Sequence, residues 1–342
     1  MSYYKDSEIK TNQKIKELLS CCPDYVSDYI RSIQFTTTAK TRLGYLICIK
    51  HFIDYVKDIE CCDDVVTMDV LDNLNRRFFE DYLDYLKEYE IDGKVYTNDL
   101  PSIKTKLYAV KGFFGYLFDE ELISRDETAR IKIPKLRKKE IIRLESDEVK
   151  DFVNTVDSGK GFSDRELLFH EKLKSRDLAI ILLFLATGMR ISELVGINLK
   201  DLDFEKSCVR IIRKGMKQDT VYFSDYCKKY LQEYYNSRLN ITAREGHEDA
   251  LFLSNRQQRI SVRNVQDLVK KYASVAVPGK HITPHKLRST YGSMLYENTS
   301  DIYLVAQSLG HNSVDTSSKY YVTTSDKKKK ENRNAVDLQS DE

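Results

Sequence analysis

Four side chains in residues 281–321 have the types and spacing to bind and attack a phosphate. His285 and Arg288 lie three residues apart, so a helix would present both on one face. His311 follows further on, and Tyr320 lies nine residues beyond it. An arginine can grip two phosphate oxygens, an imidazole can move a proton, and a tyrosine hydroxyl can attack. Taken alone, the same residues would fit two helices with polar ends.

The elements around these residues are predicted by helix-end signals. Thr283 followed by Pro284 indicates an N-cap with proline at the first helical position. The apolar run IYLVAQSL ends at Gly310, which predicts a helix end and leaves the next imidazole at an exposed corner. Two helices are therefore expected to bring the histidines and the arginine to their termini.

A further arginine follows the most apolar part of the chain. Residues 177–187 are apolar on all sides, which is typical of a buried helix, and Gly188-Met189-Arg190 comes next. A guanidinium beside such a helix needs an anionic partner, because an unpaired buried charge is costly. A structural salt bridge to Glu193 or Asp201 explains Arg190 at least as well as a ligand does.

Residues 207–223 change to a two-residue period. The pattern SCVRII, RKGMKQ, DTVYF predicts a β-hairpin with Lys214-Gly215 at its tip, and ALFLS further on predicts a short strand. Lys214 could carry an ammonium group into a ligand groove. By itself, a lysine in a turn is more simply a solvated residue.

A basic segment follows the first part of the chain, ARIKIPKLRKKEIIRL, in which Pro134 prevents a continuous helix. The alternatives are a solvated linker and a linker that follows a phosphate backbone, and the density of cations favours contact with DNA. The cations are Arg130, Lys132, Lys135, Arg137, Lys138, Lys139 and Arg143.

Helical spacing of apolar residues dominates residues 24–121, with four helices expected near 24–33, 38–56, 78–89 and 103–117. No strand-like alternation is evident there, so a compact four-helix module is predicted. Residues 1–22 read as a polar helix ending before Pro23. Residues 159–174 read as a loop or short helix.

Composition fits a soluble globular protein of about two domains: 342 residues, 41% hydrophobic and 32% charged. The longest apolar run, residues 178–186, is too short to span a membrane, and no secretory signal is visible. The net charge of +2 does not by itself argue for a nucleic-acid partner. The tail, residues 323–342, is charged and expected to be disordered, with Val336 and Leu338 as a docking patch for a neighbouring subunit.

The seven cysteines include the adjacent pairs Cys21-Cys22 and Cys61-Cys62. Adjacent cysteines suit neither the spacing of a zinc site nor an ordinary disulfide framework, and histidines number only six. No metal site is expected, and reduced thiols in a cytosolic protein are the default.

The ordered set ATGMRISEL, RKGMKQ, HKLR, LGH and a tyrosine nine residues later resembles the tyrosine recombinase (phage integrase) family. The resemblance covers residues 146–322 and extends more loosely to the helical module. It implies a mostly α fold with a small antiparallel β-sheet: an N-terminal four-helix core-binding domain and a mixed α+β catalytic domain. The expected segments are 1–22 (appendage), 23–128 (DNA-binding), 129–145 (linker), 146–322 (catalytic) and 323–342 (flexible tail).

Carried over residue by residue, Arg190 resembles the first clamp arginine and Lys214 the hairpin lysine. His285 and Arg288 match the H-x-x-R pair, His311 the later histidine, and Glu193 a supporting acid. Tyr320 takes the nucleophile position. With 23 tyrosines in the chain and Tyr321 adjacent, spacing from His311 rather than tyrosine identity selects Tyr320.

The resemblance implies cutting and rejoining of DNA through a 3′-phosphotyrosyl link, with no metal, ATP or other cofactor. Expected partners are double-stranded DNA with inverted repeats and a homotetramer on two duplexes that exchanges C-terminal segments, with an accessory DNA-bending protein left open. A separate arm-binding domain looks absent, which favours a simple recombinase. The role is integration or excision of a mobile element, or resolution of replicon dimers, in the cytoplasm at the nucleoid. The alternatives are relaxation by a type IB topoisomerase and a noncatalytic DNA-binding protein.

Overall fold

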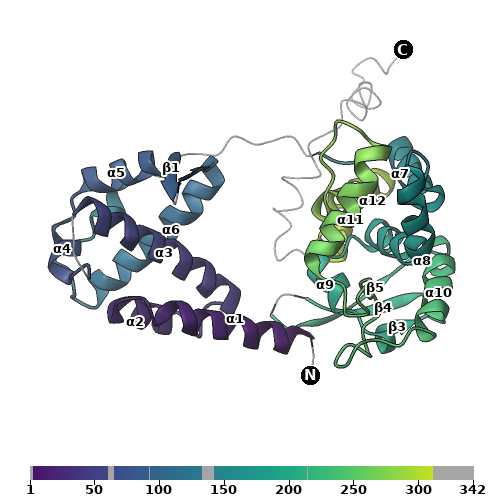
Figure 1. Cartoon of the computed structure of the whole chain (residues 1–342), viewed down its shortest axis with the longest axis horizontal. Coiled ribbons are helices and arrows are strands. Elements are labelled where there is room, and N and C mark those ends of the chain that lie inside the picture. The colour runs from purple at the N-terminus through teal and green to yellow at the C-terminus, as the bar shows by residue number, and fades with distance from the viewer. Residues whose placement is uncertain (1–2, 61–64, 92, 133–141, 214, 311–342) are drawn as a thin grey trace, which may run out of the picture. The chain divides into compact units, whose positions relative to one another are not determined.

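The computed structural model describes residues 3–60, 65–91, 93–132, 142–213 and 215–310 (Figure 1). The chain divides into two compact units, residues 1–139 and 140–342. Among the described residues, no helix has the length and apolar character needed to cross a membrane.

The first unit is built from helices packed on an aromatic core. Phe52 of its third helix is fully buried and packs against Phe79, Tyr82 and Phe114 at ring-centroid distances of 5.0–5.8 Å. These rings come from three helices, so the aromatic cluster joins them. The elements are α1 (Tyr3–Leu19), α2 (Asp24–Ser32), α3 (Ala39–Ile59), α4 (Met68–Asn73), α5 (Arg76–Tyr85), β1 (Glu88–Ile91), β2 (Lys94–Thr97), α6 (Leu100–Asp119) and η1 (Glu127–Arg130).

A hairpin in this unit corrects the expectation of no strand there. β1 and β2 pair antiparallel with Tyr89 opposite Tyr96, and Gly93 in the turn has a φ of 72°. Its strands lie mostly exposed, so they lack the alternation of buried and exposed residues that signals a strand in sequence. The helix expected over 78–89 accordingly ends at Tyr85.

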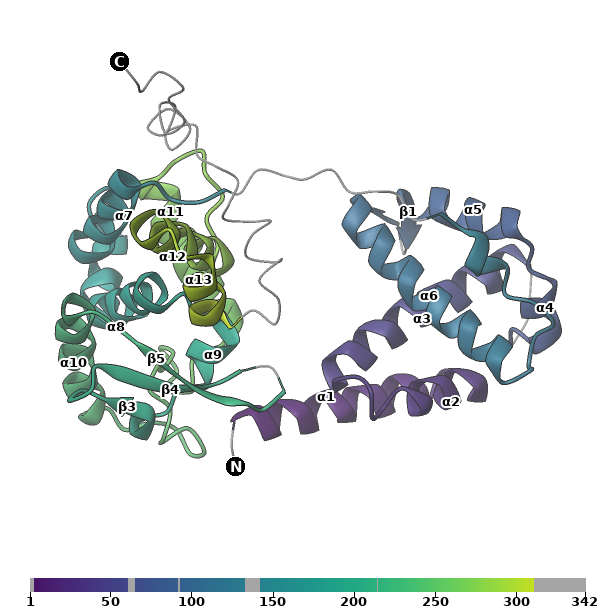
Figure 2. The same ribbon diagram turned by 180° about the vertical axis from the view of Figure 1, so that it is seen from behind.

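The second unit surrounds α8 with other helices and a small sheet (Figure 2). α8 packs against α7, α10 and α12, while α13 packs against α12. The elements are α7 (Ser146–Ser158), α8 (Asp164–Thr187), α9 (Ile191–Gly196), η2 (Leu199–Asp201), β3 (Leu202–Asp203), β4 (Cys208–Ile212), β5 (Gln218–Tyr222), α10 (Asp225–Leu239), α11 (Val262–Ala276), α12 (Pro284–Thr299) and α13 (Ile302–Leu309).

The three-stranded antiparallel sheet has the order β3-β4-β5. β4 and β5 form the predicted hairpin, with Val209 opposite Val221 and Ile212 opposite Gln218, so this prediction is confirmed. The strand expected at ALFLS is reduced to isolated bridges, in which Ala250 pairs with Asn198 and Leu253 with Arg259.

Helix α8 is longer than its sequence suggests. It starts at Asp164, where Ser163 and Glu166 cap one another, and runs through the polar residues expected to form a loop or a short helix. This capping box satisfies main-chain groups at the start of the helix, so polar residues there do not prevent it. Its second half, Leu178 to Phe184, is buried on every side, as predicted.

A buried network of hydrogen bonds connects α8 to α11. Asp177 is 4% exposed; it accepts hydrogen bonds from Arg176 at 2.7 and 2.9 Å and from the Tyr272 hydroxyl at 3.0 Å. Because the one hydroxyl proton of Tyr272 goes to Asp177, Nδ1 of the buried His170, 3.1 Å away, carries a proton and donates it to the tyrosine oxygen. Burial, followed by the charge of Asp177, raises the pKa of Tyr272.

We expect Asp177→Ala to lower the free energy of unfolding of this unit by about 3 kcal/mol, because it leaves the Arg176 guanidinium, only 13% exposed, without its carboxylate and removes the acceptor of the buried Tyr272 hydroxyl. Urea unfolding followed by circular dichroism, with separate transitions for the two units, measures the loss. Asp267→Ala is the control: Asp267 pairs with Arg263 at 3.0 Å on the surface, and its loss should cost less than about 1 kcal/mol. Equal midpoints for the two variants would contradict the prediction.

Candidate active site

The start of α12 is built as its sequence predicts. The Thr283 side chain accepts a hydrogen bond from Lys286 N, and Pro284 occupies the first turn. His285 lies exposed in that turn, whereas Arg288, one turn later, is 4% exposed. The arginine therefore points into the protein and reaches other elements.

Arg190 lies where α8 gives way to α9. Gly188 ends α8 with a φ of 59°, and a Cβ on it would overlap the ring of Tyr291 in α12, so only glycine fits. Arg190 is the N-cap of α9; its main-chain N–H donates to Glu193 Oε2 at 2.7 Å and its Nη1 to Glu193 Oε1 at 2.9 Å. Glu193 is 2% exposed, so the arginine is held by a buried carboxylate.

This pairing is the first of the two salt bridges considered for Arg190. The second expected partner, Asp201, instead accepts a hydrogen bond from Asn198 N at 2.8 Å. The salt bridge does not use the whole guanidinium, because the side chain of Arg190 remains 37% exposed. Arg190 can therefore be both a partner of Glu193 and a ligand of an anion.

Three guanidinium groups converge on the last carbonyls of α13. Arg190 Nη2 donates to Gly310 O at 3.2 Å, and Arg288 donates to Leu309 O and, at 2.7 Å, to Gly188 O. Arg213 Nη1 donates to Leu309 O at 3.1 Å. The final carbonyls of a helix have no partner within it and carry the negative end of its dipole, which explains why cations collect there.

Arg213 was not among the residues expected here. It directly precedes Lys214, and its phase along the strand is that of Val209 and Ile211, which are buried. A cation on the buried phase of a strand needs a partner, and Arg213 finds one in Asp219, to which its Nε donates. This alternation is the sequence signal that could have identified it.

His285 stands in a positive environment. Although the residue is exposed, the protein around the ring removes part of its water and lowers the pKa of His285, and the charges of Arg288, Lys286 and Arg190 lower this pKa further. His285 lies three residues before Arg288 on α12, so the two side chains share one face of that helix. A neutral imidazole beside converging guanidinium groups is suited to binding an anion and accepting a proton.

The described residues include four of the predicted site residues. Arg190, Glu193 and Arg288 come together at the end of α13, and His285 lies three residues before Arg288 on α12. The other predicted residues, Lys214, His311, Tyr320, Lys135, Arg137, Lys138, Lys139 and the tail, lie outside the described residues. Of the basic segment, Arg130 and Lys132 are exposed. Arg143 is turned to the protein instead, with ion pairs to Glu145 at 3.2 Å and Glu297 at 2.8 Å.

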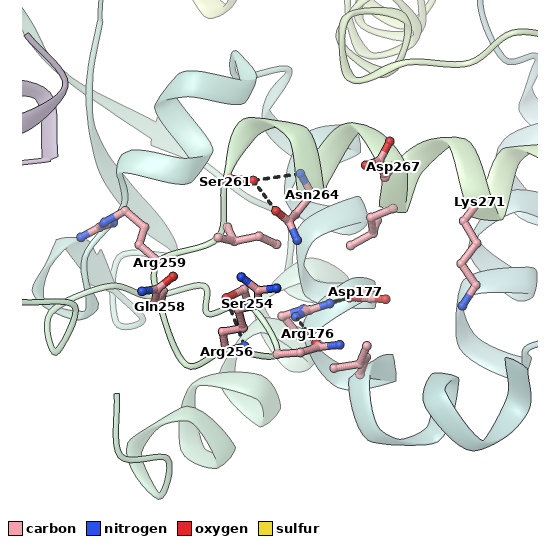
Figure 3. A pocket seen from close by; sticks show the side chains of 14 residues that line it. Arg176, Asp177, Ser254, Arg256, Gln258, Arg259, Ser261, Asn264, Asp267 and Lys271 are labelled. Carbon is pink, nitrogen blue, oxygen red and sulfur yellow. Dashed lines mark hydrogen bonds and ion pairs between the residues drawn. The ribbon is translucent and has the colours of Figure 1, made fainter. Parts of the chain in front are cut away.

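A cavity of about 790 Å³ lies elsewhere, between α8, α11 and residues 254–261 (Figure 3). Its wall includes the Arg176–Asp177 pair and, further along α11, Lys271. Ser261 at the start of α11 bonds to Asn264. None of the residues that line this cavity belongs to the converging arginine group, so it is separate from the candidate active site.

Comparison with known sequences identifies the family of this chain and two relatives, one of them similar along almost its whole length. A model of the phage integrase family matches residues 142–328. Tyrosine recombinase XerS of Streptococcus agalactiae serotype III (strain NEM316) is 31% identical across 95% of this chain and 98% of the relative. Tyrosine recombinase XerC of Caldanaerobacter subterraneus subsp. tengcongensis is 37% identical across 66% of this chain and 60% of the relative.

Solved structures share the fold. XerH site-specific recombinase bound to a palindromic difH substrate, a post-cleavage complex, aligns with a TM-score of 0.67 and 19% identity, covering 87% of this chain and 80% of that one. The Tn1549 transposon integrase in complex with circular intermediate DNA aligns with a TM-score of 0.66 and 16% identity, covering 90% and 98%. The mostly helical architecture with small antiparallel sheets is thus that of these proteins.

Proposed function

Because the chain belongs to the phage integrase family of tyrosine recombinases, we propose that it separates replicon dimers by recombination at a specific DNA site, with Tyr320 as its nucleophile. As a member of the family, it is an enzyme that cuts and rejoins DNA strands. Recombination is supported by similarity to tyrosine recombinase XerS along almost the whole of both chains, and dimer resolution is the one of the predicted roles that we adopt. The choice of site is supported by the convergence of Arg190, Arg213 and Arg288, with His285 three residues before Arg288 on α12.

A phosphodiester resists attack because its negative charge repels a nucleophile, and the arginines counter this charge. Arg190 and Arg288 neutralise the nonbridging oxygens and favour the pentacoordinate transition state, and His311 adds a hydrogen bond. Glu193 keeps Arg190 oriented through two contacts, at 2.7 and 2.9 Å. Binding therefore begins from a guanidinium that is already in place.

Proton transfers complete the chemistry. His285 takes the proton from the Tyr320 hydroxyl as its oxygen bonds to phosphorus, and the bond from phosphorus to the 5′ oxygen breaks. Lys214 gives a proton to the departing 5′ oxygen. A 5′-hydroxyl of another strand reverses these steps and reseals the DNA, so the phosphotyrosyl link conserves the energy of the broken bond.

Four strands are cut and rejoined in a complete exchange, so the working assembly is a tetramer on two duplexes with inverted-repeat sites. The basic residues Arg130, Lys132, Lys135, Arg137, Lys138 and Lys139 contact the phosphate backbone in it. The tail, residues 323–342, passes between subunits, and the enzyme acts in the cytoplasm at the nucleoid.

The test uses a plasmid that carries two directly repeated copies of the bound site, identified by footprinting. Resolution into two circles, together with exchange of strands between two labelled duplexes, is the expected result. Relaxation of supercoils without strand exchange would instead indicate topoisomerase action. Binding with neither reaction would indicate a noncatalytic DNA-binding protein.

The pH dependence of cleavage tests His285 as the base. Its pKa lies below the ordinary value of 6.5, so the neutral, proton-accepting form persists at pH 7 and is lost only as the pH falls below 6.5. We expect the second-order rate constant for cleavage, measured at low protein concentration, to fall with acidification in that range, since this constant reports the free enzyme.

His285→Asn should slow cleavage by about 10²–10⁴-fold. Its rate constant should also no longer fall as the pH drops below 6.5, so the acidic limb of the pH–rate profile disappears. His281→Asn serves as the matched control, because His281 is exposed and precedes α12, and it should keep the limb. An unchanged limb in His285→Asn would assign the titration to another group.

A further inference from the structure

Arg213 joins two elements that are distant in sequence. Its Nε donates to Asp219 of β5, its Nη1 to Leu309 O at 3.1 Å and its Nη2 to Ser308 O at 3.1 Å. The side chain is 11% exposed. One guanidinium thus connects the β4–β5 hairpin to the last turn of α13.

On the hairpin side, Arg213 marks the base of the turn. Its main-chain N–H donates to Lys217 O at 2.8 Å, directly beyond the Ile212–Gln218 pair that ends the ladder. Asp219 is on the facing strand. The turn therefore cannot shift toward or away from α13 without breaking the contacts of the Arg213 side chain.

On the α13 side, the guanidinium lies against Gly310. This residue has a φ of 59°, and a Cβ on it would overlap the Arg213 guanidinium, so glycine serves both the helix end and the close approach of the arginine. Arg190 binds the Gly310 carbonyl, and Arg288 shares the Leu309 carbonyl with Arg213.

The carboxylate of Glu193 connects Arg213 to Arg190, which together with Arg288 forms the proposed phosphate clamp. Glu193 Oε1 lies 2.9 Å from Arg190 Nη1 and 3.9 Å from Arg213 Nη1, so the two arginines share one buried anion. When Arg213 is changed, α13 keeps its bonds to Arg190 and Arg288, whereas the hairpin loses the guanidinium that joins it to α13. The base of the hairpin therefore loses its side-chain attachment to α13, although β4 still packs on α9 and β5 on α8.

We propose that Arg213 is a positioning residue for strand cleavage: it holds the base of the hairpin against the end of α13, so that the hairpin delivers its proton donor to the phosphate bound by the clamp. This inference rests on the proposed function, in which Lys214 protonates the leaving 5′ oxygen. Arg213 itself acts through the hairpin and the helix end.

The first experiment separates cleavage from binding. Single-turnover cleavage of a nicked suicide duplex at saturating protein should be about 100-fold slower in Arg213→Gln and Arg213→Lys, the loss expected from a misplaced catalytic group. The Kd for the duplex should stay at the wild-type value. Arg210→Lys, on the exposed phase of the same strand and bonded to Lys200 O at 2.7 Å, should cleave normally.

A duplex with sulfur in place of the bridging 5′ oxygen tests whether the Arg213 variants are slow because the proton donor in the hairpin is misplaced. A thiolate leaves without a proton, because thiols are far more acidic than alcohols. Lys214→Ala and Arg213→Gln should both recover most of their rate on this substrate, and Asp219→Asn should add little to the defect of Arg213→Gln.

Failures of the two proposals are distinguishable. A Lys214→Ala variant that is not restored by sulfur would remove the proposed role of Lys214. Restoration of Lys214→Ala but not of Arg213→Gln would overturn the role of Arg213 alone. Wild-type cleavage by Arg213→Gln, or loss of DNA affinity in step with cleavage, would overturn it as well.

Discussion

Replacing Tyr320 by phenylalanine is expected to abolish the covalent protein–DNA complex on a nicked suicide duplex. The phenyl ring keeps the shape of the side chain but has no oxygen to bond to phosphorus, so no phosphotyrosyl link can form. A denaturing gel that resolves labelled DNA attached to protein measures the loss. DNA affinity, measured in a gel shift, should be retained, because the change removes a nucleophile and no charge.

The adjacent tyrosine supplies the matched control. Tyr321→Phe should still form the covalent complex; neighbouring residues of a helix point about 100° apart, so in a helical segment only one of the two can face the phosphate. The opposite result, with the complex lost in Tyr321→Phe and kept in Tyr320→Phe, would move the nucleophile by one residue. Loss in neither would remove both from the mechanism.

The second large effect is expected from substitution of Arg190 or Arg288, the two arginines of the proposed phosphate clamp. Arg190→Lys and Arg288→Lys each keep a positive charge but lose the planar fork that grips two oxygens, and removing one such donor typically slows a reaction by about 10²–10³-fold. Single-turnover cleavage on the same duplex measures the effect. The double variant should lose less than the product of the two defects, because the arginines act on one phosphate.

Arg165→Lys, in the exposed first turn of α8, is the control for the clamp variants and should cleave at the wild-type rate. Circular dichroism should show that both clamp variants remain folded, since lysine can still donate to one carbonyl of Gly188, Leu309 or Gly310. Wild-type cleavage by either folded variant would exclude that arginine from the clamp.

Local signals predicted well the helix ends and the hairpin that carry Arg190, Arg288 and Arg213. The Thr283-Pro284 start of α12, the glycine ends of α8 and α13, and the β4–β5 hairpin are all confirmed, because each depends on residues a few positions apart. Capping and turn geometry act within one turn of the chain, which explains why sequence alone suffices. The pairing of Arg190 with Glu193, three residues away, belongs to the same class.

Contacts across long separations could not be predicted in this way. Arg213 meets Ser308 and Leu309, some 95 residues away, only because the sheet and α13 pack in the same unit. The β1–β2 hairpin was missed because its strands are exposed and carry no alternating pattern. The start of α8 was left open between a loop and a short helix, because a polar surface helix resembles a loop in composition.

The shared attachment of three arginines at the end of α13 has a consequence for synthesis of the chain. Arg190, Arg213 and Arg288 are all translated before the Ser308–Gly310 carbonyls that hold them. A ribosome-bound chain that stops short of this turn lacks the carbonyls to which the three guanidinium groups donate. Under the proposed function, both this turn and the Tyr320 that follows it must be made before the chain can cut DNA.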